Sequence, residues 1–338
     1  MKIAIHHREG SFSNKWIEYC EYNQIEFIIV DAFSNDIIDQ IKGVDIFLWH
    51  HHQGIFEDTI WARTLLNCLE LKGILVFPNF NTAWHFDNKI AQKLLFESLN
   101  LNSIKSYVFF DKAKAESWVK STSFPKVFKL KGGASSSNVM LVKSKSQANR
   151  IIKKAFGTGF NQFNKWNYFK ENISKFKESK DFNFCLKAFY RLIFKPDFSK
   201  KAGKEIGYSY FQDFIKDNDS DIRIIIIGDK AIGIKRLVRK NDFRASGSGK
   251  ILYDKNQIPI VCVEMAFETV KCLNAQCLAF DFVFDNGKPL IVEISYGFLQ
   301  SAYYKCPGYW TSDLEWKNEA VTPEFWIIEN MINETNKK

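Results

Sequence analysis

The chain has 338 residues, of which 46% are hydrophobic and 25% are charged, and this composition excludes a largely disordered protein. The length predicts two or three domains. No run of about 18 apolar residues occurs, so we expect no transmembrane helix and no stable membrane insertion. The opening residues are too polar for a signal peptide, and the seven cysteines form no CxxC pair. Together these features predict a reducing, cytoplasmic location and argue against a structural zinc site.

The first third of the chain alternates between strand-like and helix-like segments. Apolar runs predict strands at residues 2–5, 26–30, 44–49 and 73–77. The patterns between and after them predict helices at residues 14–22, 35–41, 59–71 and 82–100. Strands that alternate with helices are typical of a parallel, doubly wound sheet, so we predict an α/β domain here.

The rest of the chain is richer in strands. These are predicted at residues 107–110, 126–130, 139–142, 210–215, 222–227, 231–237, 279–284 and 290–294. A basic, helix-like segment at about 147–205 and a helix at 261–273 interrupt them, and Gly228-Asp229 and Asn286-Gly287 predict hairpin turns. The predicted fold class is therefore α/β followed by α+β. We place the domain boundaries so that the domains span residues 1–105, 106–210 and 211–338.

Positive charge is concentrated in one segment. The formal net charge is +9, and residues 165–205 hold eleven Lys or Arg against five Asp or Glu, an excess of six. Such a segment can bind nucleic acid, anionic lipid or a phosphorylated substrate, but a solvent-exposed helical face is the simpler interpretation. The segment lacks the regular aromatic interleaving of a base-stacking surface, so we expect no nucleic-acid partner.

A loop rich in glycine and serine lies between two predicted strands, at residues 131–138. Small residues let a ligand approach the backbone, and hydroxyl and N–H groups can hold phosphates, with Lys129 nearby to meet their charge. The alternative is a flexible turn that binds nothing. A second such run, residues 246–250, resembles a Walker A loop but fails its spacing, because Arg244 stands where the first glycine belongs.

Two carboxylates are predicted to face each other across a hairpin. Asp281 lies in one strand, and Glu293 lies twelve residues later in the next, beyond the Asn286-Gly287 turn. Adjacent like charges in a sheet repel unless a cation joins them, and Mg²⁺ commonly takes one or two carboxylates plus substrate phosphates. Taken alone, such a pair also fits a solvent-facing rung, but the apolar flanks on both strands favour a metal.

Histidines follow the first and third predicted strands. In a parallel sheet these strand ends meet at one edge, where open α/β sheets bind ligands. With Arg8 they can form a site for an anionic or hydroxylated substrate, and the alternative is a set of surface side chains at loop starts. The histidines concerned are His6, His7, His50, His51 and His52.

In their order along the chain, these motifs resemble the ATP-grasp superfamily. The matching segments are Asp87-Asn88-Lys89, residues 124–129, the Gly/Ser loop, residues 211–215, Asp221-Ile222-Arg223, and residues 241–244, 280–282 and 292–295. The resemblance spans roughly residues 75–300. It implies an ATP-grasp fold, in which an N-terminal α/β domain precedes two α+β subdomains that clamp a nucleotide. Residues 293–296 and 306–310 also resemble members encoded in surface or capsular polysaccharide gene clusters.

The resemblance implies how ATP would bind. It assigns Lys89 and Lys129 to the nucleotide phosphates, and Asp221 to the ribose. The mobile lid over the phosphates corresponds to Gly132, Gly133, Ser135, Ser136 and Ser137. The hinge that holds adenine through backbone groups corresponds to Gln212, Asp213, Phe214 and Ile215.

The resemblance also implies catalytic and metal-binding residues. It places Arg236 at the transferred phosphoryl group, and it assigns Arg223 and Arg244 to the acceptor carboxylate. Magnesium ligands are implied at Asp281 and Glu293, in agreement with the hairpin argument. A third ligand in the family is usually Asn, but here the position holds Ser295, and a hydroxyl is a poorer neutral oxygen donor than an amide carbonyl. Occupancy by two metal ions is therefore in doubt.

The activity implied by the resemblance is that of an ADP-forming carboxylate–amine ligase that uses ATP and Mg²⁺. We expect the carboxylate to be a uronic acid of a surface-polysaccharide precursor, carried on a nucleotide or a lipid, and the amine to be an amino acid or amino alcohol. The alternatives are a phosphotransferase acting on a small-molecule or sugar acceptor, and a nucleotide-binding module without activity. The sequence leaves the oligomeric state open, although homodimers are common among the proteins that it resembles.

Overall fold

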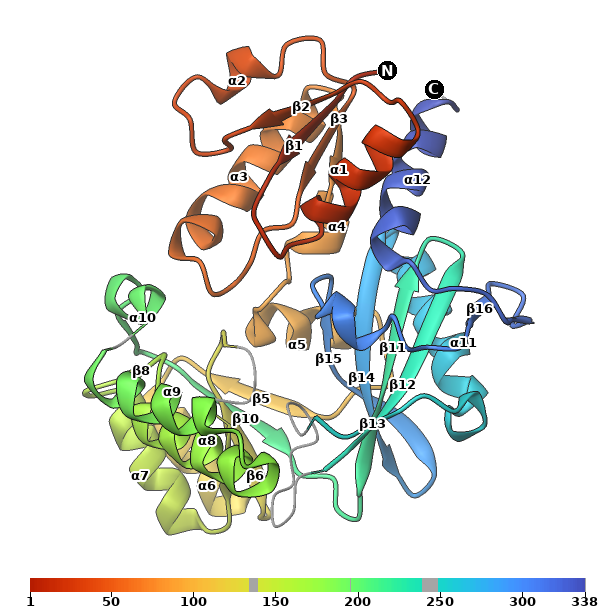
Figure 1. The fold of residues 1–338 in the computed structure, drawn as a ribbon. Helices are drawn as coiled ribbons and strands as arrows, with labels where there is room; N and C mark the ends of the chain where they lie inside the picture. The colour runs from red at the N-terminus through yellow and green to blue at the C-terminus, as the bar shows by residue number, and fades with distance from the viewer. Residues whose placement is uncertain (134–138, 195, 239–248, 338) are drawn as a thin grey trace.

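The computed structural model describes residues 1–133, 139–194, 196–238 and 249–337. Three large sheets organise these residues: two four-stranded sheets, one near the N-terminus and one in the middle of the chain, and a seven-stranded sheet near the C-terminus; a two-stranded ribbon accompanies the middle one. Figure 1 shows the three bodies and places both termini at the N-terminal one. In the described part of the chain, no helix combines the length and the apolar character that crossing a membrane requires.

The N-terminal sheet is parallel and has the strand order β2-β1-β3-β4. Its elements are β1 (Ile3–His6), α1 (Ser13–Tyr22), β2 (Phe27–Val30), α2 (Ile37–Gln40), β3 (Ile46–Trp49), α3 (Phe56–Leu71) and β4 (Leu75–Phe77). Successive side chains point to opposite faces: Ile3 and Ile5 join a core with α1, while Ala4 joins a core with α2 and α3. The doubly wound parallel sheet predicted from the sequence is therefore confirmed.

The C-terminal helix α12 (Pro323–Thr335) returns to this sheet, beside α1 (Figure 1). The indole nitrogen of Trp16 on α1 donates a hydrogen bond to the backbone carbonyl of Glu324 at 3.1 Å. Trp326, Ile327 and Ile328 of α12 are buried in the same core as Ile3 and Ile5. The last helix of the chain thus joins the first domain to the seven-stranded sheet.

The predicted helix at residues 82–100 is wrong, because the structure contains two helices there, α4 (Phe80–Ala83) and α5 (Lys89–Ser98). Asp87 has a left-handed φ of 50°, which interrupts the helical path. Asn88 then caps α5, since its side-chain oxygen accepts a hydrogen bond from the N–H of Ala91 at 3.1 Å. The break sets Lys89 at the first turn of α5.

The middle sheet is antiparallel and has the order β5-β10-β6-β7. Its strands and covering helices are β5 (Ser106–Phe109), α6 (Lys112–Ser121), β6 (Lys126–Lys129), β7 (Met140–Val142), α7 (Lys145–Ala155) and β10 (Ser209–Asp213). Phe128 and Phe211 of the sheet pack with Ala115 of α6 and Ile152 of α7. Strand β10 spans the predicted domain boundary between residues 210 and 211.

The basic segment is not one helix. It contains β8 (Phe160–Asn161), α8 (Lys165–Ser179), α9 (Phe182–Ile193), α10 (Asp197–Lys201) and β9 (Lys204–Glu205), and β8 pairs with β9. Asp181 caps α9 by accepting a hydrogen bond from the N–H of Asn183 at 2.9 Å, and Pro196 precedes α10. The cap and the proline end one helix and begin the next, although the helical periodicity of the sequence continues through both positions.

The seven-stranded sheet has the order β15-β14-β11-β12-β16-β17, with β13 also paired to β12. Its elements are β11 (Ser220–Ile227), β12 (Lys230–Leu237), β13 (Ile251–Leu252), the 3-10 turn η1 (Lys255–Gln257), α11 (Ile260–Leu273), β14 (Cys277–Asp285), β15 (Lys288–Ser295), the 3-10 turn η2 (Gln300–Ala302), β16 (Tyr309–Thr311) and β17 (Trp316–Lys317). Gly228, Asn286 and Gly287 have positive φ, which the two predicted hairpin turns require.

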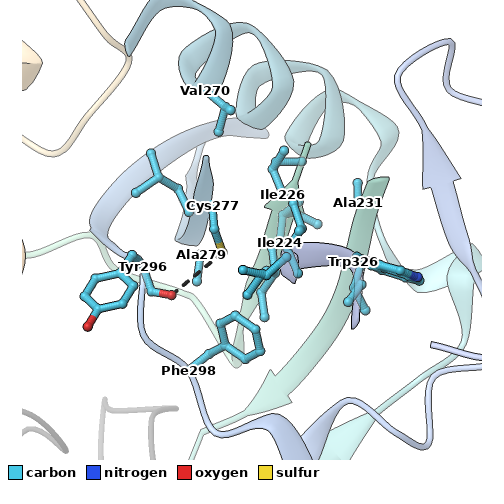
Figure 2. Close-up of a cluster of buried hydrophobic side chains, with 14 of the residues drawn as sticks. Ile224, Ile226, Ala231, Val270, Cys277, Ala279, Tyr296, Phe298 and Trp326 are labelled. Carbon is cyan, nitrogen blue, oxygen red and sulfur yellow. Dashed lines mark hydrogen bonds between the residues drawn. The ribbon is translucent and has the colours of Figure 1, made fainter. Parts of the chain in front are cut away.

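The core of this domain lies against the same sheet (Figure 2). Ile224 and Ile226 of β11 pack with Ala279 of β14, Val270 of α11 and Trp326 of α12. The thiol of Cys277 donates a hydrogen bond to the backbone carbonyl of Tyr296 at 3.8 Å. Near the start of β11 the pattern changes, because charged side chains alternate with the buried isoleucines.

Candidate active site

A row of charged side chains crosses one face of the seven-stranded sheet. On β11, Asp221 and Arg223 alternate with buried Ile222 and Ile224, so the two charged residues share a face. The register places Arg223 opposite Asp281 of β14, and Asp221 opposite Arg236 of β12. Antiparallel pairing thus brings two acids and two arginines from three strands together.

These four residues form a buried ion-pair network. The Nε of Arg223 lies 2.5 Å from Oδ1 of Asp281, and its Nη2 lies 2.8 Å from Oδ2. Arg236 binds both oxygens of Asp221 at 2.6 Å, and its Nη2 also lies 2.9 Å from Oδ2 of Asp281. Burial disfavours ionisation of Asp281, but the two guanidinium groups outweigh it and hold the pKa of its carboxyl well below its usual value.

Glu293 extends this row onto β15. It pairs directly with Asp281, as the hairpin prediction required, and a register shift follows between Asp281 and Phe282. The Nζ of Lys89 lies 3.9 Å from a carboxylate oxygen of Glu293. Gln92, one turn further along α5, donates to the backbone carbonyl of Ile294 at 2.8 Å and accepts from its N–H at 3.2 Å. This amide contact holds α5 against β15 and positions Lys89 beside Glu293.

The base of the Gly/Ser loop is fastened to the segment before α5. Both carboxylate oxygens of Asp87 accept hydrogen bonds from the N–H of Gly133, at 2.9 and 3.0 Å. The N–H of Lys89 donates to the carbonyl of Lys131 at 2.9 Å, and its Nζ donates to the carbonyl of Gly133 at 3.3 Å. A Cβ at Gly132 would lie 2.9 Å from Oδ2 of Asp87, so a larger residue would disturb this attachment.

Lys129 is a buried cation of the site. Its Nζ donates a hydrogen bond of 2.6 Å to Oε1 of Gln212 on the neighbouring strand β10. Burial lowers the pKa of Lys129 to about 8, although the nearby carboxylate of Glu293 opposes the shift. An anion placed beside Lys129 would restore its pKa, so the site favours a ligand that carries negative charge.

A cavity of about 170 Å³ lies between the middle sheet and the seven-stranded sheet. Apolar side chains such as Ile104, Val127 and Val292 form part of its wall. The sequence-predicted residues that line it are Lys89, Lys129, Gly133, Gln212, Asp213, Phe214, Ile215, Asp221, Asp281 and Glu293. Most of the residues assigned to a nucleotide are thus brought to one place.

Other predicted residues lie elsewhere. Arg236 is not among the residues that line this cavity, since its guanidinium is held between Asp221 and Asp281. Gly132 lines a neighbouring cavity of about 240 Å³. The predicted positions Ser135, Ser136, Ser137 and Arg244 lie outside the described residues.

A further cavity of about 350 Å³ adjoins the first one. Lys89, Gly133 and Glu293 line both of them. Arg8, Arg223 and Ser295 line only the second of the two, which lies between the seven-stranded sheet and the carboxyl ends of the N-terminal strands. Arg8 is held there by Asp58 at 3.1 Å and by the backbone carbonyl of His50 at 3.0 Å.

The five predicted histidines do not form one cluster: some lie at the cavities beside the carboxyl ends of the N-terminal strands, and others pack against neighbouring aromatic side chains. His6 and His7 are not among the residues that line the cavities; His6 packs edge-on against Phe33 and Trp49. His50 is buried and stacks on Phe12 with ring centroids 3.6 Å apart, although it borders the larger cavity.

The two histidines that follow on the chain differ from each other in exposure. Burial lowers the pKa of His51 to about 3, so this side chain is neutral near pH 7. His52 lines both the 240 Å³ and the 350 Å³ cavity. Of the predicted histidine cluster, His52 is therefore the member best placed to meet a ligand.

The two carboxylates have the chemistry that Mg²⁺ prefers. Among the described residues, only Arg223 donates a hydrogen bond to Oδ1 of Asp281, so this oxygen retains a lone pair, and the Lys89 ammonium lies 3.9 Å from Glu293. They therefore fit one Mg²⁺ shared with ligand phosphates. The hydroxyl of Ser295 donates to the carbonyl of Gly297 at 2.8 Å. Within the described ranges no three His, Cys, Asp or Glu side chains form a metal-binding group.

Sequence reasoning missed two features of the site. The first is the attachment of Asp87 to Gly133, for which the only signal was the proximity of Asp87 to the predicted lysine. The second is the pairing of Arg223 and Arg236 with Asp281, which could have been inferred by extending the hairpin register to β11 and β12. The buried side chain of Tyr303, from the segment that comes after β15, lies beside Arg223 of this group.

No protein-family model matches the sequence, and a search of curated proteins finds none that is similar. Solved structures do match. D-alanine–D-alanine ligase from Bacillus anthracis superposes with a TM-score of 0.57 at 15% identity, over 100% of this chain and 99% of that one. The chain has the ATP-grasp fold. A RimK domain ATP-grasp protein from Sphaerobacter thermophilus gives 0.54 at 13% identity, over 98% of this chain and 100% of that one.

A third structure with the ATP-grasp fold is the ligase PsnB in complex with a minimal precursor. It gives a TM-score of 0.58 at 11% identity, over 98% of each chain. At such identities the likeness establishes the ATP-grasp fold, as the sequence motifs predicted, and the activity has to be argued from the site.

Proposed function

We propose that this protein is an ATP-dependent ligase that joins a carboxylate to an amine and releases ADP and phosphate. The observation that carries the proposal is the pair of adjoining cavities that share Lys89, Gly133 and Glu293. The smaller one combines apolar walls with two lysines, which suits a nucleotide. The larger one contains Arg8 and Arg223, which suit an anionic acceptor. A phosphoryl group passing between them would meet the charge of Lys89.

Proteins with the same fold support this class of chemistry. The Bacillus anthracis protein is a D-alanine–D-alanine ligase, and a second structure of it contains ATP, with a TM-score of 0.56 at 14% identity to this chain. PsnB is an ATP-grasp ligase. A biotin carboxylase domain from Hydrogenobacter thermophilus, with a TM-score of 0.57 at 12% identity, was solved with MgADP.

The nucleotide would occupy the 170 Å³ cavity. We assign the adenine to the backbone of residues 212–215 and the ribose to Asp221, as the family resemblance implies. Lys89 and Lys129 would bind the phosphates from two sides. Glu293 and Asp281 would hold Mg²⁺, which when bound neutralises charge on the phosphate oxygens.

The acceptor would occupy the larger cavity, with its carboxylate toward Arg223. A carboxylate and an amine do not condense at neutral pH, because hydroxide is a poor leaving group. In the first step a carboxylate oxygen bonds to the terminal phosphorus of ATP, and the bond from that phosphorus to ADP breaks. The amine nitrogen then bonds to the acyl carbon, phosphate leaves with the former carboxylate oxygen, and the nitrogen loses one proton.

The chain's own residues would contribute positioning and charge neutralisation to both steps. Lys89 lies at the wall that both cavities share, so it can follow the phosphoryl group from donor to acceptor. Asp87 holds Gly133 at the same wall, which fixes the base of the Gly/Ser loop beside Lys89. The acyl phosphate needs protection from water, which is the task that the family resemblance implies for this loop.

For the substrates, we propose a uronic acid of a surface-polysaccharide precursor and an amino acid or amino alcohol. Support comes from the family resemblance of residues 293–296 and 306–310, and from the arginines and His52 at the larger cavity, which suit an acidic, hydroxylated molecule. A carrier nucleotide or lipid would extend from the cavity. In line with the resemblance, we propose a cytoplasmic enzyme, with a homodimer as the oligomer to test first.

The test is a screen of nucleotide-linked uronic acids against a panel of amines, with Mg²⁺ and ATP, followed by mass spectrometry of the products. The proposal predicts ADP only when acid and amine are both present, together with an amide mass. A product heavier by one phosphoryl group would instead identify a phosphotransferase. Absence of ATP binding in the presence of Mg²⁺ would contradict both activities.

A further inference from the structure

The helical hairpin formed by α8 and α9 exposes an unusually apolar surface. Six large side chains of α9 and its C-terminal cap have exposed fractions between 51% and 76%. They are Phe182, Leu186, Phe189, Tyr190, Ile193 and Phe194. Trp166 of α8 is exposed to a similar degree. Contiguous exposed apolar side chains on a folded protein commonly mark a site of interaction.

The exposed side chains form a continuous stripe. Phe182, Leu186, Phe189 and Ile193 follow the spacing that places residues on one side of a helix. The opposite side of α9 is accounted for, because Ala188 is buried and Phe184 and Cys185 are half-buried. The stripe touches α8 only at its aromatic members, since Phe182 lies edge-on to Phe176 and Phe189 lies edge-on to Phe169. All four stripe residues nevertheless keep more than half of their surface exposed.

The charge on the hairpin is positive. Residues 165–194 contain seven Lys or Arg and three Asp or Glu, an excess of four. On α9 itself the charged residues are Lys187 and Arg191, both basic. At 100° per residue, Lys187 lies roughly 130° around the helix from the centre of the stripe and Arg191 roughly 170°. Tyr190 lies between the stripe and these two residues, and the Arg191 guanidinium lies 5.3 Å from its ring centroid. An apolar face with basic residues on the polar face is typical of helices that lie in the interface of an anionic membrane.

We propose that the α8–α9 hairpin binds the surface of an anionic lipid bilayer, with the stripe of α9 among the lipid headgroups and the positive excess of the hairpin attracted to their phosphates. The chain would lie on the membrane and would not cross it. Figure 1 shows α8 and α9 at the periphery of the molecule, where a flat surface can reach them. This proposal is independent of the reaction at the active site.

The charge also argues against a second copy of this chain as the occupant. A symmetric interface built on the hairpin would bring two surfaces with the same positive excess together, and like charges across an interface are unfavourable. A nucleic acid would be drawn to the lysines but would leave the aromatic and aliphatic stripe without a partner. An anionic lipid surface satisfies both parts of the hairpin.

Binding at the hairpin would bring the acceptor region close to the membrane. Helix α10 follows α9 directly, and its Phe198 lines the 240 Å³ cavity together with Gly132 of the loop base. Lys201 of α10 pairs with Glu57 of α3, which connects the hairpin region to the N-terminal domain. For the lipid-linked acceptor of the proposed function, this arrangement would allow entry from the bilayer, although membrane binding itself does not depend on that function.

The test uses sedimentation of the full-length protein with vesicles. We expect binding to equimolar phosphatidylcholine and phosphatidylglycerol, and at least ~10-fold weaker binding to phosphatidylcholine alone or at high salt, since the electrostatic contribution is screened. Equal binding to both kinds of vesicle, or none to either, would overturn the proposal.

Two variants locate the contact. Leu186→Glu and Ile193→Glu replace exposed side chains, so we expect the fold to persist and the vesicle affinity to fall at least ~10-fold. Leu71→Glu is the matched control, because Leu71 is 88% exposed at the end of α3, far along the chain from the hairpin. Its vesicle affinity should equal that of the wild type.

Sedimentation velocity without lipid tests the alternative that a second copy of this chain covers the stripe. A dimer that Ile193→Glu dissociates would show that a second copy covers the stripe and would overturn the proposal. A mass unchanged by that substitution, with vesicle binding lost, is the expected result. Circular dichroism and thermal unfolding verify that both hairpin variants keep the fold of the wild type.

Discussion

At the scale of single residues, the site balances burial against charge. Asp281 stays ionised in a buried position because two guanidinium groups bind its oxygens. Lys129 has no such carboxylate within direct hydrogen-bonding distance in the described structure, and its recorded partner is the neutral amide of Gln212. Burial therefore lowers the pKa of Lys129 to about 8, whereas Asp281 keeps a low pKa.

The first prediction concerns the pH dependence of nucleotide binding. Lys129 loses its positive charge as the pH rises through its pKa of about 8, so ATP affinity should decline above that pH, approaching ~10-fold per pH unit. Calorimetric titrations with ATP on either side of this pKa measure the slope. Lys129→Met should bind more weakly without this pH dependence, and an equally steep decline in that variant would assign the proton to another group.

Loss of the Lys129 proton should change the folding stability in the opposite direction to the ATP affinity. Between pH values of about 8 and 10.5 the unfolded chain keeps the Lys129 proton that the folded chain has lost. The contribution of Lys129 to the free energy of unfolding of the ligand-free protein therefore rises across this window, while ATP affinity falls. A decrease in both quantities would show that general alkaline unfolding is being measured.

The second prediction concerns Glu293. Glu293→Gln removes a charge at constant size, so turnover should fall at least ~100-fold while the melting temperature stays near that of the wild type. Asp285→Asn is the matched control, since Asp285 is an exposed residue on the same hairpin. It should keep wild-type activity. If Glu293→Gln keeps more than roughly a few per cent of the wild-type activity, Glu293 is not a principal metal ligand.

At the scale of elements, the decisive contacts join segments that are distant in the sequence. Helix α5 is positioned by Gln92 against β15, and the loop base is held by Asp87. The sequence predicted the hairpin that pairs Asp281 with Glu293, because its turn residues and apolar flanks are local signals. It did not predict the break before α5, since the helical periodicity continues through it and the positive φ at Asp87 has no strong local signature.

The third prediction tests the attachment of the loop. Asp87→Gly tolerates the positive φ but removes both acceptors for the N–H of Gly133, so the KM for ATP should rise about 10-fold. Asn88→Ala is the control, because loss of the α5 cap should lower the free energy of unfolding by about 1 kcal/mol and leave the KM unchanged. Steady-state kinetics and chemical denaturation separate the two effects. Equal KM changes in both variants would mean that helix position, not the loop, is responsible.

At the scale of the whole molecule, the site depends on how the three bodies meet. Gln276, beside β14, donates to the carbonyl of Val76 at 2.9 Å and accepts from the N–H of Asn79 at 2.8 Å, which fixes the first domain on the third. The 350 Å³ cavity has residues of both these domains in its wall, among them Arg8 and Arg223. The parallel sheet, the strand-rich remainder and the cluster of residues assigned to a nucleotide could be predicted from local patterns and motif order.

The rest required the tertiary structure. Patterns along the chain did not indicate that α12 would return to the N-terminal sheet, or that the basic segment would divide into a hairpin with one uncovered face. The burial of His50 and His51 could not be predicted either, because a histidine at a strand end has the same local sequence whether it packs in the core, as His50 does on Phe12, or faces a ligand. Such outcomes depend on which bodies pack together.

The measurement that tests the central claim most directly is transfer of an oxygen isotope. A carboxylate substrate found in the screen is labelled with ¹⁸O in its carboxyl group and is incubated with the enzyme, ATP, Mg²⁺ and the amine. Attack of the carboxylate on ATP predicts one ¹⁸O atom in each phosphate released, because that oxygen bonds to phosphorus before the amide forms. Phosphate without the label, accompanied by an amide product, would contradict the acyl-phosphate mechanism.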